Sequence, residues 1–518
     1  MVAAKPRGLS HRFFGLSLAT ALSRVSGFGR DVVLFGSLGT SGASAAFLFA
    51  FTLPHLFRRL LGEGALASAL IPIFSQEFHR RGREAALRLL QQVFSWATLL
   101  LTGLLLLGAA LFWGLGHIPN LEEHRVLGFR LALVLLPFAL FICLTALATA
   151  ALNVLGHFFL AATPAIWLNL CLIASLLVSN ACGWEALTKV YVLSSAVLLG
   201  GLLPLLLLLG QLRQQGWCWR WDFRPSPALV ELKSLFLPGL LGAAVVQLNL
   251  AISRCLAFSL QANAVSLLYL AERLIDLPLG IFVITLTTLF FPQMSRSSAA
   301  RCDEDFWQEA RRGLLGALFV SVPAALGLGL LGSEILQMLF VWGQFRTGDV
   351  LSALPVLRIF TLALPFCALS SFLTRIHHAK KDMRVPLRAS AYAFGINLSL
   401  SFLLLHPLQV RGLAWAHVLA VFFQTGYLGM HLRPPGFSPK KLVEPIGGIL
   451  LSAAGMGGFL LLFRRRGFFA DNLSRPQHAG RLFLLILLGM LVYFALLSLW
   501  NFRRRRVFPR RPMRGLRH

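Results

Sequence analysis

Apolar runs recur along almost the whole chain, from near residue 12 to near residue 500. Many are unbroken for about twenty residues, as between residues 92 and 114, and an α-helix of that length crosses the roughly 30 Å hydrocarbon core of a bilayer. A membrane β-barrel would instead show segments of about ten residues with alternating polarity. The pattern therefore predicts an all-α polytopic membrane protein.

The runs separate into about fourteen transmembrane helices, each with the roughly twenty residues that a span requires. Their centres lie near Ala21, Phe51, Leu104, Leu136, Leu168, Val197, Ala244, Ile284, Ala324, Thr361, Ile396, Ala420, Ala454 and Leu488.

An internal repeat suggests how these spans are organised. Residues 21–24 (ALSR) resemble residues 251–254 (AISR), and residues 71–75 (IPIFS) resemble residues 291–295 (FPQMS) in the same order. Chance similarity between short apolar strings is the alternative. Repeats of this kind are a transporter architecture. They predict an N-terminal six-helix lobe at 1–212, a C-terminal six-helix lobe at 213–435, an extra helix pair at 436–502 and a basic tail at 503–518.

Charge is sparse, at 13% of residues, but strongly basic, with a net charge of +28. A soluble protein would need more charge to cover its surface. Nucleic-acid binding is disfavoured, because the basic residues mostly lie between apolar runs and form no single soluble domain. The positive-inside rule explains them better, and places both termini in the cytoplasm of a bacterial inner-membrane protein.

One loop breaks this rule. Arg464, Arg465 and Arg466 follow the thirteenth run and fall on the predicted outer side. Either that span is shifted, or the charge bias of the other loops overrides it.

The seven cysteines form no C-x-x-C pair, and most lie inside apolar runs, so neither a disulfide nor a zinc site is expected. A glycine-rich loop of the P-loop type is missing from the sequence, and no catalytic group of residues stands out. The sequence thus predicts a transporter with no catalytic residues, no metal and no cofactor.

Five arginines lie inside or at the ends of predicted spans. Arg24 and Arg30 are in the first span, Arg58 and Arg59 end the second, and Arg273 begins the eighth. Facing lipid, they would together cost roughly 12–18 kcal/mol, since each costs about 2.5–3.5 kcal/mol at the bilayer centre. That exceeds the stability of a typical protein. They must therefore pair, reach the headgroup layer or line a water-filled cavity.

Arginine's planar guanidinium binds phosphate through two parallel hydrogen bonds, so a cavity lined by arginines favours an anionic, phosphate-bearing substrate. Glu63 follows Arg59 by one helical turn and is a candidate acidic partner. The alternative interpretation is that Arg58 and Arg59 anchor their helix at the interface, and that Glu63 only pairs with Arg59.

Several motifs resemble those of the MurJ (MviN) family of lipid II flippases, in the multidrug/oligosaccharidyl-lipid/polysaccharide exporter superfamily. Residues 23–31 (SRVSGFGRD) resemble the family's first-helix signature, and residues 53–66 (LPHLFRRLLGEGAL) its second. Residues 271–280 (AERLIDLPLG) resemble its eighth helix, and residues 379–386 (AKKDMRVP) the loop before helix eleven.

This resemblance implies two six-helix bundles around a central cavity, with two C-terminal helices forming a groove for a polyprenyl tail. It further implies alternating access that carries lipid II, the undecaprenyl-diphosphate-linked peptidoglycan precursor, from the cytoplasmic to the periplasmic leaflet for cell wall biogenesis. The implied partners are lipid II, membrane lipids and proteins of peptidoglycan synthesis, and the chain is expected to be a monomer. The implied substrate-binding residues are Arg24, Arg30, Arg58, Arg59, Glu63, Ser266 and Arg273.

The chain departs from the family pattern at three positions of the second span. Ala45 stands where an acidic residue is common, and Thr52 and His55 stand at the usual basic and asparagine positions. These changes bear on gating and on contact with the headgroup.

The sequence leaves other transporter functions open. One alternative is a flippase for another polyprenyl-diphosphate-linked glycan, and another is a drug exporter of the same superfamily. A drug exporter would need acids in its cavity to attract cationic drugs, whereas the predicted cavity is basic. A glycosyltransferase would need a carboxylate in an ordered outer loop, and an anion channel would leave the repeat unexplained.

Overall fold

The computed structural model describes residues 7–60, 66–300, 302–432, 440–466, 468–469 and 475–504. Over these residues the chain forms helices and no strands. Eleven helical stretches in this part of the chain are long and apolar enough to cross a membrane. The prediction of an all-α polytopic membrane protein is confirmed.

All fourteen predicted centres lie in helices. Three of them, Ala21, Phe51 and Ala244, lie in helices that are not among the eleven candidate spans. The helix that holds Phe51 has only 16 residues, fewer than the roughly twenty that a span requires. The count of fourteen spans therefore stays a prediction.

The chain divides into two compact units, described separately below. Unit 1 comprises Met1–Ser266 and Trp342–Arg346, and unit 2 comprises Leu267–Val341 and Thr347–His518. The first unit thus extends beyond the predicted lobe boundary at residue 212. Its last helix packs against earlier helices of the same unit, which is why residues 213–266 belong with it.

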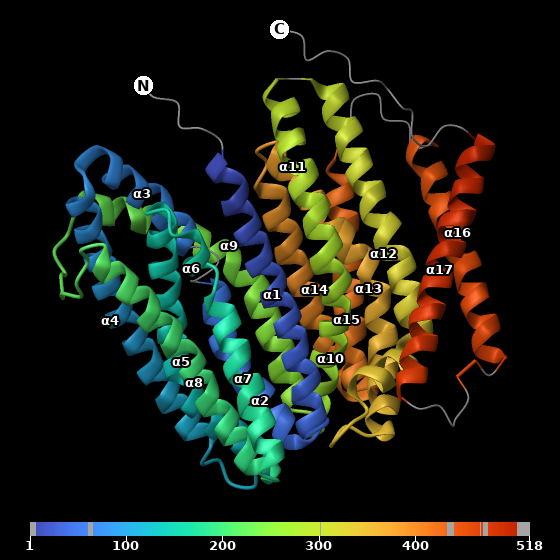
Figure 1. Cartoon of the computed structure of the whole chain (residues 1–518), viewed down its shortest axis with the longest axis horizontal. Coiled ribbons are helices and arrows are strands. Elements are labelled where there is room, and N and C mark those ends of the chain that lie inside the picture. Colours follow the sequence, from blue (N-terminus) through green and yellow to red (C-terminus); the bar gives the residue numbers. More distant parts are fainter. Residues whose placement is uncertain are drawn as a thin grey trace. The chain divides into compact units, whose positions relative to one another are not determined.

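Unit 1 is a bundle built around a central helix, α5 (Figure 1). Five helices of this unit contact α5, namely α2, α3, α4, α6 and α8, while α7 joins α8 to α1. The helices of this unit are α1 (Arg7–Leu38), α2 (Gly42–Phe57), α3 (Leu66–Arg81), α4 (Arg83–Leu115), α5 (Glu123–Val154), α6 (Phe158–Ala161), α7 (Pro164–Ala181), α8 (Ala186–Gln214) and α9 (Pro227–Phe258).

A short segment between two helices of unit 2, Trp342–Arg346, is held in unit 1 by α1. The backbone N–H of Gln344 donates to the carbonyl of Gly36 at 2.8 Å, and Phe345 packs edge-on against Phe35. The Trp342 ring lies directly over Gly36, where a Cβ atom would come within 2.1 Å of it. Only glycine allows this close approach.

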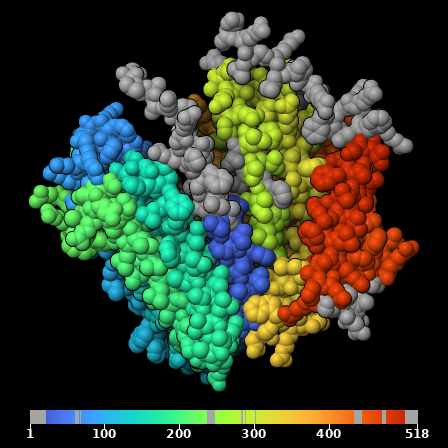
Figure 2. Space-filling view, in the orientation of Figure 1, coloured from blue at the N-terminus to red at the C-terminus, as the bar shows by residue number. Residues whose placement is uncertain are grey.

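Unit 2 contains the remaining helices, and its C-terminal pair packs on the longest of them. Both α16 and α17 contact α12 as well as each other, and they are drawn in red in Figure 2. The helices of this unit are α10 (Ala264–Pro278), which begins in unit 1, the π-helix η2 (Leu279–Val283), α11 (Ile284–Ala299), α12 (Asp303–Phe340), α13 (Thr347–Ala379), α14 (Arg384–Leu408), α15 (Val410–Met430), α16 (Lys440–Arg465) and α17 (Arg475–Arg504).

The predicted repeat coincides with a similar helix break in the two units. The end of α2 continues as a π-helical turn over residues 58–60, and α10 continues as η2 directly after Pro278. Aligning Pro72 with Pro292, as the repeat does, sets Leu279 opposite Arg59. Proline and π-helical turns both interrupt the regular hydrogen-bond ladder of a helix, so each unit contains a broken span at the same place in the repeat.

The arginines that break the positive-inside pattern are partly explained by unit 2. Nε of Arg464, at the end of α16, lies 3.0 Å from Oε1 of Glu334 on α12, whose side chain is 8% exposed. Arg464 also donates to the carbonyl of Leu330 at 3.2 Å. This arginine is therefore part of the contact between α16 and α12, whereas Arg465 and Arg466 are exposed.

Candidate functional site

The first helix contributes a buried arginine that is fully engaged by its neighbours. Arg30, 8% exposed, donates from Nε and Nη2 to Oδ1 of Asp31 at 3.0 and 2.6 Å. Its Nη1 donates to Oδ1 of Asn169 on α7 at 3.2 Å. Burying a charge is costly unless it is paired and hydrogen-bonded, and Arg30 meets both conditions.

Asn169 joins this arginine to the helix that bears it. Its Nδ2 donates to the carbonyl of Ser23 at 3.2 Å and to Oγ of Ser26 at 3.0 Å. The amide of Asn169 thus binds two residues of α1 that are about one helical turn apart, and its oxygen accepts a hydrogen bond from Arg30. This arrangement fixes the direction in which Arg30 points.

The second helix presents two more arginines, in the π-helical turn that ends it. Arg58 and Arg59 are half-buried, and Nη2 of Arg58 lies 3.3 Å from Nε2 of His55, one turn earlier. A π-helical turn widens the helix locally and is frequent at functional sites. The turn brings successive basic residues next to the histidine.

A fourth arginine reaches α2 from α9. Arg254 is 8% exposed and donates from Nη1 to Oγ1 of Thr52 at 2.9 Å. Thr52 in turn donates to the carbonyl of Leu48 at 2.7 Å. At the position where the family resemblance leads us to expect a basic residue, a hydroxyl therefore accepts a hydrogen bond from an arginine of another helix.

These side chains form one electrostatic cluster around His55. Arg58, Arg59, Arg254 and Arg30 all act on its ring by Coulomb interaction, and we call these four residues with His55 the arginine cluster. Asp31 is bound to Arg30, and the guanidinium groups of the other three arginines lie near the same histidine. Like charges gathered away from bulk water favour an anionic ligand strongly, because the local dielectric constant is low.

The structure describes three of the other four predicted site residues. Arg24 is exposed on α1. Ser266 is fully buried and hydrogen-bonds Ser44 at 3.2 Å, which is about 16 Å along α2 from His55 at 1.5 Å per residue. Arg273 is half-buried in unit 2. Glu63 lies outside the described residues.

Three residues of the site were missing from the predicted set. Arg254 was detectable, because the repeat aligns it with Arg24. Asn169 and His55 are polar residues within apolar runs, and such residues usually mark function in membrane spans. Their partners are distant in sequence or depend on the π-helical turn, so the runs alone could not identify those partners.

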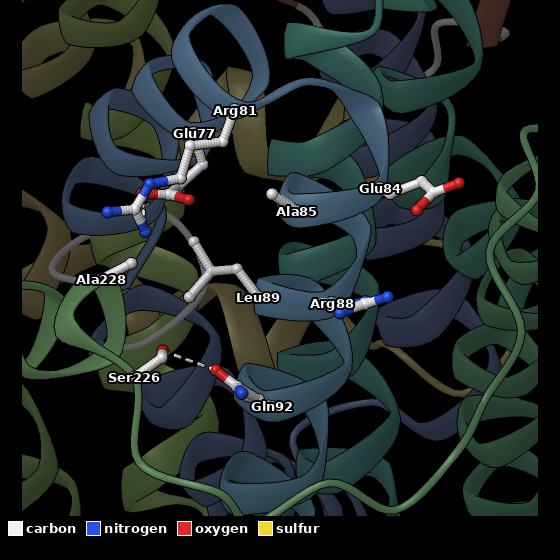
Figure 3. A pocket seen from close by; sticks show the side chains of 9 residues that line it. All are labelled: Glu77, Arg81, Glu84, Ala85, Arg88, Leu89, Gln92, Ser226 and Ala228. Carbon is white, nitrogen blue, oxygen red and sulfur yellow. Dashed lines mark hydrogen bonds and ion pairs between the residues drawn. The ribbon is translucent and has the colours of Figure 1, made fainter.

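A separate pocket of about 360 Å³ opens between α3, α4 and the start of α9 (Figure 3). Its walls carry charges of both signs: Arg81 pairs with Glu77 at 3.5 Å, and Glu84 and Arg88 also line it. It shares no residue with the arginine cluster. The balance of its charges gives no preference for an anion.

The loop before α14 is organised by Asp382. Its Oδ1 accepts hydrogen bonds from the backbone N–H groups of Arg384 and Val385 at 3.0 and 3.2 Å, and its Oδ2 lies 3.4 Å from Nδ1 of His377. Partial desolvation raises the pKa of Asp382, but these hydrogen bonds and the nearby His377 outweigh it and lower that pKa overall.

Comparisons with known proteins agree on one family. The family described as "Lipid II flippase MurJ" matches residues 36–466. A "Probable lipid II flippase MurJ" of Rhizobium tropici is 32% identical over 498 residues, covering 94% of this chain and 93% of that protein. Another from Vibrio cholerae is 30% identical over 515 residues, covering 94% and 95%.

Solved structures give the same result. The chain is similar to "Lipid II flippase MurJ, inward closed conformation", with a TM-score of 0.79, 25% identity, and coverage of 95% of this chain and 99% of that one. An inward-facing multidrug resistance MATE family transporter of the MOP superfamily has a TM-score of 0.65 at 15% identity, covering 79% and 94%. This second likeness concerns the fold alone.

Proposed function

The chain belongs to the lipid II flippase MurJ family, and from this premise we propose that it moves lipid II from the cytoplasmic to the periplasmic leaflet of the bacterial inner membrane. Both termini are cytoplasmic in this proposal, as the distribution of basic loops favours. The protein works by alternating access as a monomer. It makes and breaks no covalent bond and needs no cofactor.

The observation that carries the proposal is the arginine cluster. Lipid II contains a diphosphate, and the cluster offers guanidinium groups from three helices, with Arg30 held in a fixed direction by Asn169. Guanidinium groups form strong, charge-assisted hydrogen bonds with phosphate oxygens. Arg24 is exposed on the same helix as Arg30 and is proposed as a further contact.

The remaining predicted residues keep their proposed roles. Arg273 is a diphosphate ligand contributed by unit 2, Glu63 is an acidic partner of the arginines, and Ser266 is a contact to the substrate. Of these, Ser266 has the weakest support, because it is fully buried against Ser44.

The proposed cycle follows from charge. With the cavity empty, repulsion between the arginines opposes closure of the lobes. When the diphosphate binds, it neutralises this repulsion and favours the closed state, since a ligand shifts an equilibrium toward the state that binds it better. The cavity then opens on the other side, while the polyprenyl tail stays in lipid along α16 and α17. Membrane lipids and proteins of peptidoglycan synthesis are the proposed further partners.

The test is complementation of cells depleted of their own flippase. Arg24→Ala, Arg30→Ala and Arg273→Ala are introduced singly, and both growth and lipid II in the outer leaflet are measured at matched expression. We expect each to impair both readouts. Arg466→Ala, which changes an exposed arginine at the end of α16, is the matched control and should rescue fully. Full rescue by all three test variants would overturn the proposed role of the arginines.

A binding assay separates the alternatives. Purified protein should bind lipid II, and the bound amount should fall in Arg273→Ala. A flippase for another lipid-linked glycan would prefer that glycan's diphosphate lipid over lipid II. A drug exporter would instead bind cationic drugs, which a cluster of arginines should repel.

A further inference from the structure

The connection between α8 and α9 contains a non-helical segment, residues 217–226, which we call the strap. Every second residue in its first part is aromatic: Trp217, Trp219, Trp221 and Phe223. The ring centroids of successive members lie 6.2, 5.9 and 5.9 Å apart. Two residues of an extended chain span roughly 6.6 Å, and alternate side chains share one side of it. The strap is therefore extended, and its four rings form a continuous row.

Polar side chains of α4 hold the strap in place. Oγ of Ser95 accepts a hydrogen bond from the backbone N–H of Asp222 at 2.9 Å. Nε2 of Gln92 donates to the carboxylate of Asp222 at 3.3 Å, and its Oε1 accepts a hydrogen bond from the hydroxyl of Ser226 at 2.6 Å (Figure 3). Because α4 binds it through several hydrogen bonds, the strap is a defined part of the surface of unit 1.

The composition of α4 places the strap at one edge of the hydrocarbon layer. Residues 97–114 of this candidate span include no charged residue, and six of their eight leucines are exposed. Two tryptophans mark the ends of this stretch: Trp113, and Trp96, whose ring centroid is 5.5 Å from that of Phe223 on the strap. They lie about 25 Å apart along the helix, at 1.5 Å per residue, close to the roughly 30 Å of the hydrocarbon core. Tryptophan is enriched at both membrane interfaces, so the strap lies in the headgroup layer on the side where α4 begins. The distribution of basic loops predicts that this side is cytoplasmic.

Three rings of the strap face outward. Trp219 is 37% exposed, Trp221 is 61% exposed and Phe223 is 41% exposed. A contiguous patch of large apolar side chains on a surface indicates a contact with lipid or with another molecule. At the level of the headgroups such a patch is favourable, because tryptophan combines an apolar ring with a polar N–H group. Its depth along α4 therefore matches the row of rings to phospholipid.

Basic side chains accompany the exposed rings. Arg220 and Arg224 alternate with them along the strap, and both are exposed. Neither of these two side chains bonds another residue in the part of the chain that the structure describes. Nζ of Lys233, on α9, lies 5.0 Å from the centre of the Trp96 ring, within the range of a cation–π interaction. Three cations thus lie on the strap or beside the aromatic row.

The acids near these cations offset them in part. Asp222 lies between the two arginines in sequence, but its carboxylate is half-buried and bound by Gln92 and by the backbone N–H of Arg224 at 3.0 Å. Its charge is therefore directed toward α4. Glu231 is exposed on α9, two residues before Lys233. The exposed charges of the strap itself are both positive, so it favours an anion in the headgroup layer.

We propose that the strap is a binding site for an anionic phospholipid of the cytoplasmic leaflet, whose phosphate is held by Arg220 and Arg224 beside the exposed rings. A guanidinium forms strong, charge-assisted hydrogen bonds with phosphate oxygens. The site goes beyond the proposed transport of lipid II and does not depend on it, since the bound lipid is a membrane component and not a substrate. It holds unit 1 at a fixed depth in the bilayer.

Native mass spectrometry of the full chain in neutral detergent tests the site, with dioleoylphosphatidylglycerol as the anionic probe and dioleoylphosphatidylcholine as the neutral one. Each basic residue near an anionic surface contributes roughly fivefold to binding. Arg220→Gln/Arg224→Gln should therefore bind phosphatidylglycerol roughly tenfold or more weakly than wild type does. Its binding of phosphatidylcholine should change by no more than roughly twofold, because that lipid has no net charge. Arg220→Lys/Arg224→Lys keeps both charges and should retain most of the affinity for phosphatidylglycerol.

A matched control removes two exposed arginines from unit 2. Arg384→Gln/Arg388→Gln changes the net charge equally at the start of α14, and it should bind phosphatidylglycerol as wild type does. The unfolding temperatures of both double variants should stay within roughly 2 °C of wild type, because the substituted side chains are exposed. A saturating amount of lipid II should leave the difference between wild type and Arg220→Gln/Arg224→Gln unchanged.

Three outcomes would overturn the proposal. Wild-type affinity for phosphatidylglycerol in Arg220→Gln/Arg224→Gln would show that the strap binds no anionic lipid and would leave its rings as a surface for a cytoplasmic protein. An equal loss in the control variant would mean that net charge alone attracts the lipid. Displacement of the strap-dependent lipid by lipid II would place it in the substrate site. None of these outcomes bears on whether the protein transports lipid II, which the complementation test decides separately.

Discussion

The two units handle buried charge in different ways. In unit 2, Glu334 and Arg464 form a one-to-one pair that joins α12 to α16, and the pair is neutral. In unit 1, four arginines lie around His55, and Arg30 among them is bound to Asp31. A neutral pair satisfies itself and contributes to packing. Several arginines gathered at one place offer many more hydrogen-bond donors than a single ion pair does, and so they indicate a binding site better than burial alone does.

The largest effect is expected at Arg30, because this residue both pairs with Asp31 and is a proposed ligand of the diphosphate. Arg30→Ala removes a proposed phosphate ligand and leaves Asp31 buried without its cation, which costs about 3–5 kcal/mol of stability. We expect loss of rescue in cells, low yield and a lower unfolding temperature. The double variant Arg30→Ala/Asp31→Asn removes the buried charge as well, and it should recover most of the stability while lipid II binding stays at least roughly 30-fold weaker.

That double variant separates the two roles of Arg30. If binding returns together with thermal stability, Arg30 serves the fold only, and the contrast between the two units disappears. Yield, unfolding temperature and Kd are measured on the same preparations, so that a poorly folded sample is not taken for a loss of binding.

The second prediction concerns the neutral pair of unit 2. Arg464→Leu leaves the buried Glu334 without its partner and should destabilise the protein by about 2 kcal/mol, less than a fully buried pair would, because Arg464 is 33% exposed. The Kd for lipid II should change by no more than roughly twofold. Thermal unfolding and binding are the measurements. A strong loss of binding at unchanged stability would show that this pair belongs to the substrate site.

The matched control removes both charges. Replacing a buried ion pair by apolar residues of similar volume is often neutral or stabilising. Glu334→Leu/Arg464→Leu should therefore unfold close to wild type. Continued destabilisation in the double variant would mean that the hydrogen bond from Arg464 to Leu330 matters more than the charge pair.

The third prediction tests Asn169 as a positioning residue. Asn169→Leu removes its hydrogen bonds to Arg30, Ser23 and Ser26. We expect lipid II binding to weaken roughly tenfold, because one buried hydrogen bond to a charged group is worth about 1.5 kcal/mol. In the Arg30→Ala/Asp31→Asn background the same substitution should have almost no further effect on Kd. Additive effects would show that Asn169 acts without Arg30.

The class of the fold followed from the sequence, and the details of the site did not. Each apolar run predicted a helix, because the bilayer requires satisfied backbone hydrogen bonds and a fixed length, and each predicted centre lies in one. The arginines could be singled out from the sequence, because a charged side chain in lipid is costly in free energy. These arginines are held by contacts between residues more than a hundred positions apart, such as Arg30 with Asn169 and Arg254 with Thr52. The local sequence pattern therefore cannot predict the contacts.

The predicted lobe boundaries stay a prediction, and the compact units divide the chain at a different place. Apolar runs can be counted, but the run centred on Ala244 can pack with either half. Its helix, α9, packs against α2, α3 and α4, so the first compact unit reaches Ser266. Similarly, Arg464 contradicted a charge rule that assumes solvated loops, because the rule takes no account of a tertiary partner such as Glu334.

The smallest effect is expected outside the membrane-spanning helices, where a charge is solvated. Asp382 accepts two backbone hydrogen bonds at the start of α14, so Asp382→Ala should destabilise the protein by about 1 kcal/mol near pH 7, as the loss of a helix cap does. The pKa of Asp382 is lowered by folding, so its contribution is complete above the unfolded pKa of about 3.9 and is lost as pH falls through the folded pKa. The difference in unfolding temperature between wild type and variant should therefore be constant from about pH 7 down to about pH 5 and then narrow in more acidic buffer.

Asp382→Asn keeps an acceptor oxygen without the charge and should retain most of the stability near pH 7. If Asp382→Asn lowers the unfolding temperature as much as Asp382→Ala does, the charge of Asp382 rather than its hydrogen bonds stabilises this loop. A partly exposed carboxylate would then contribute as much as we expect only of buried charges in this chain.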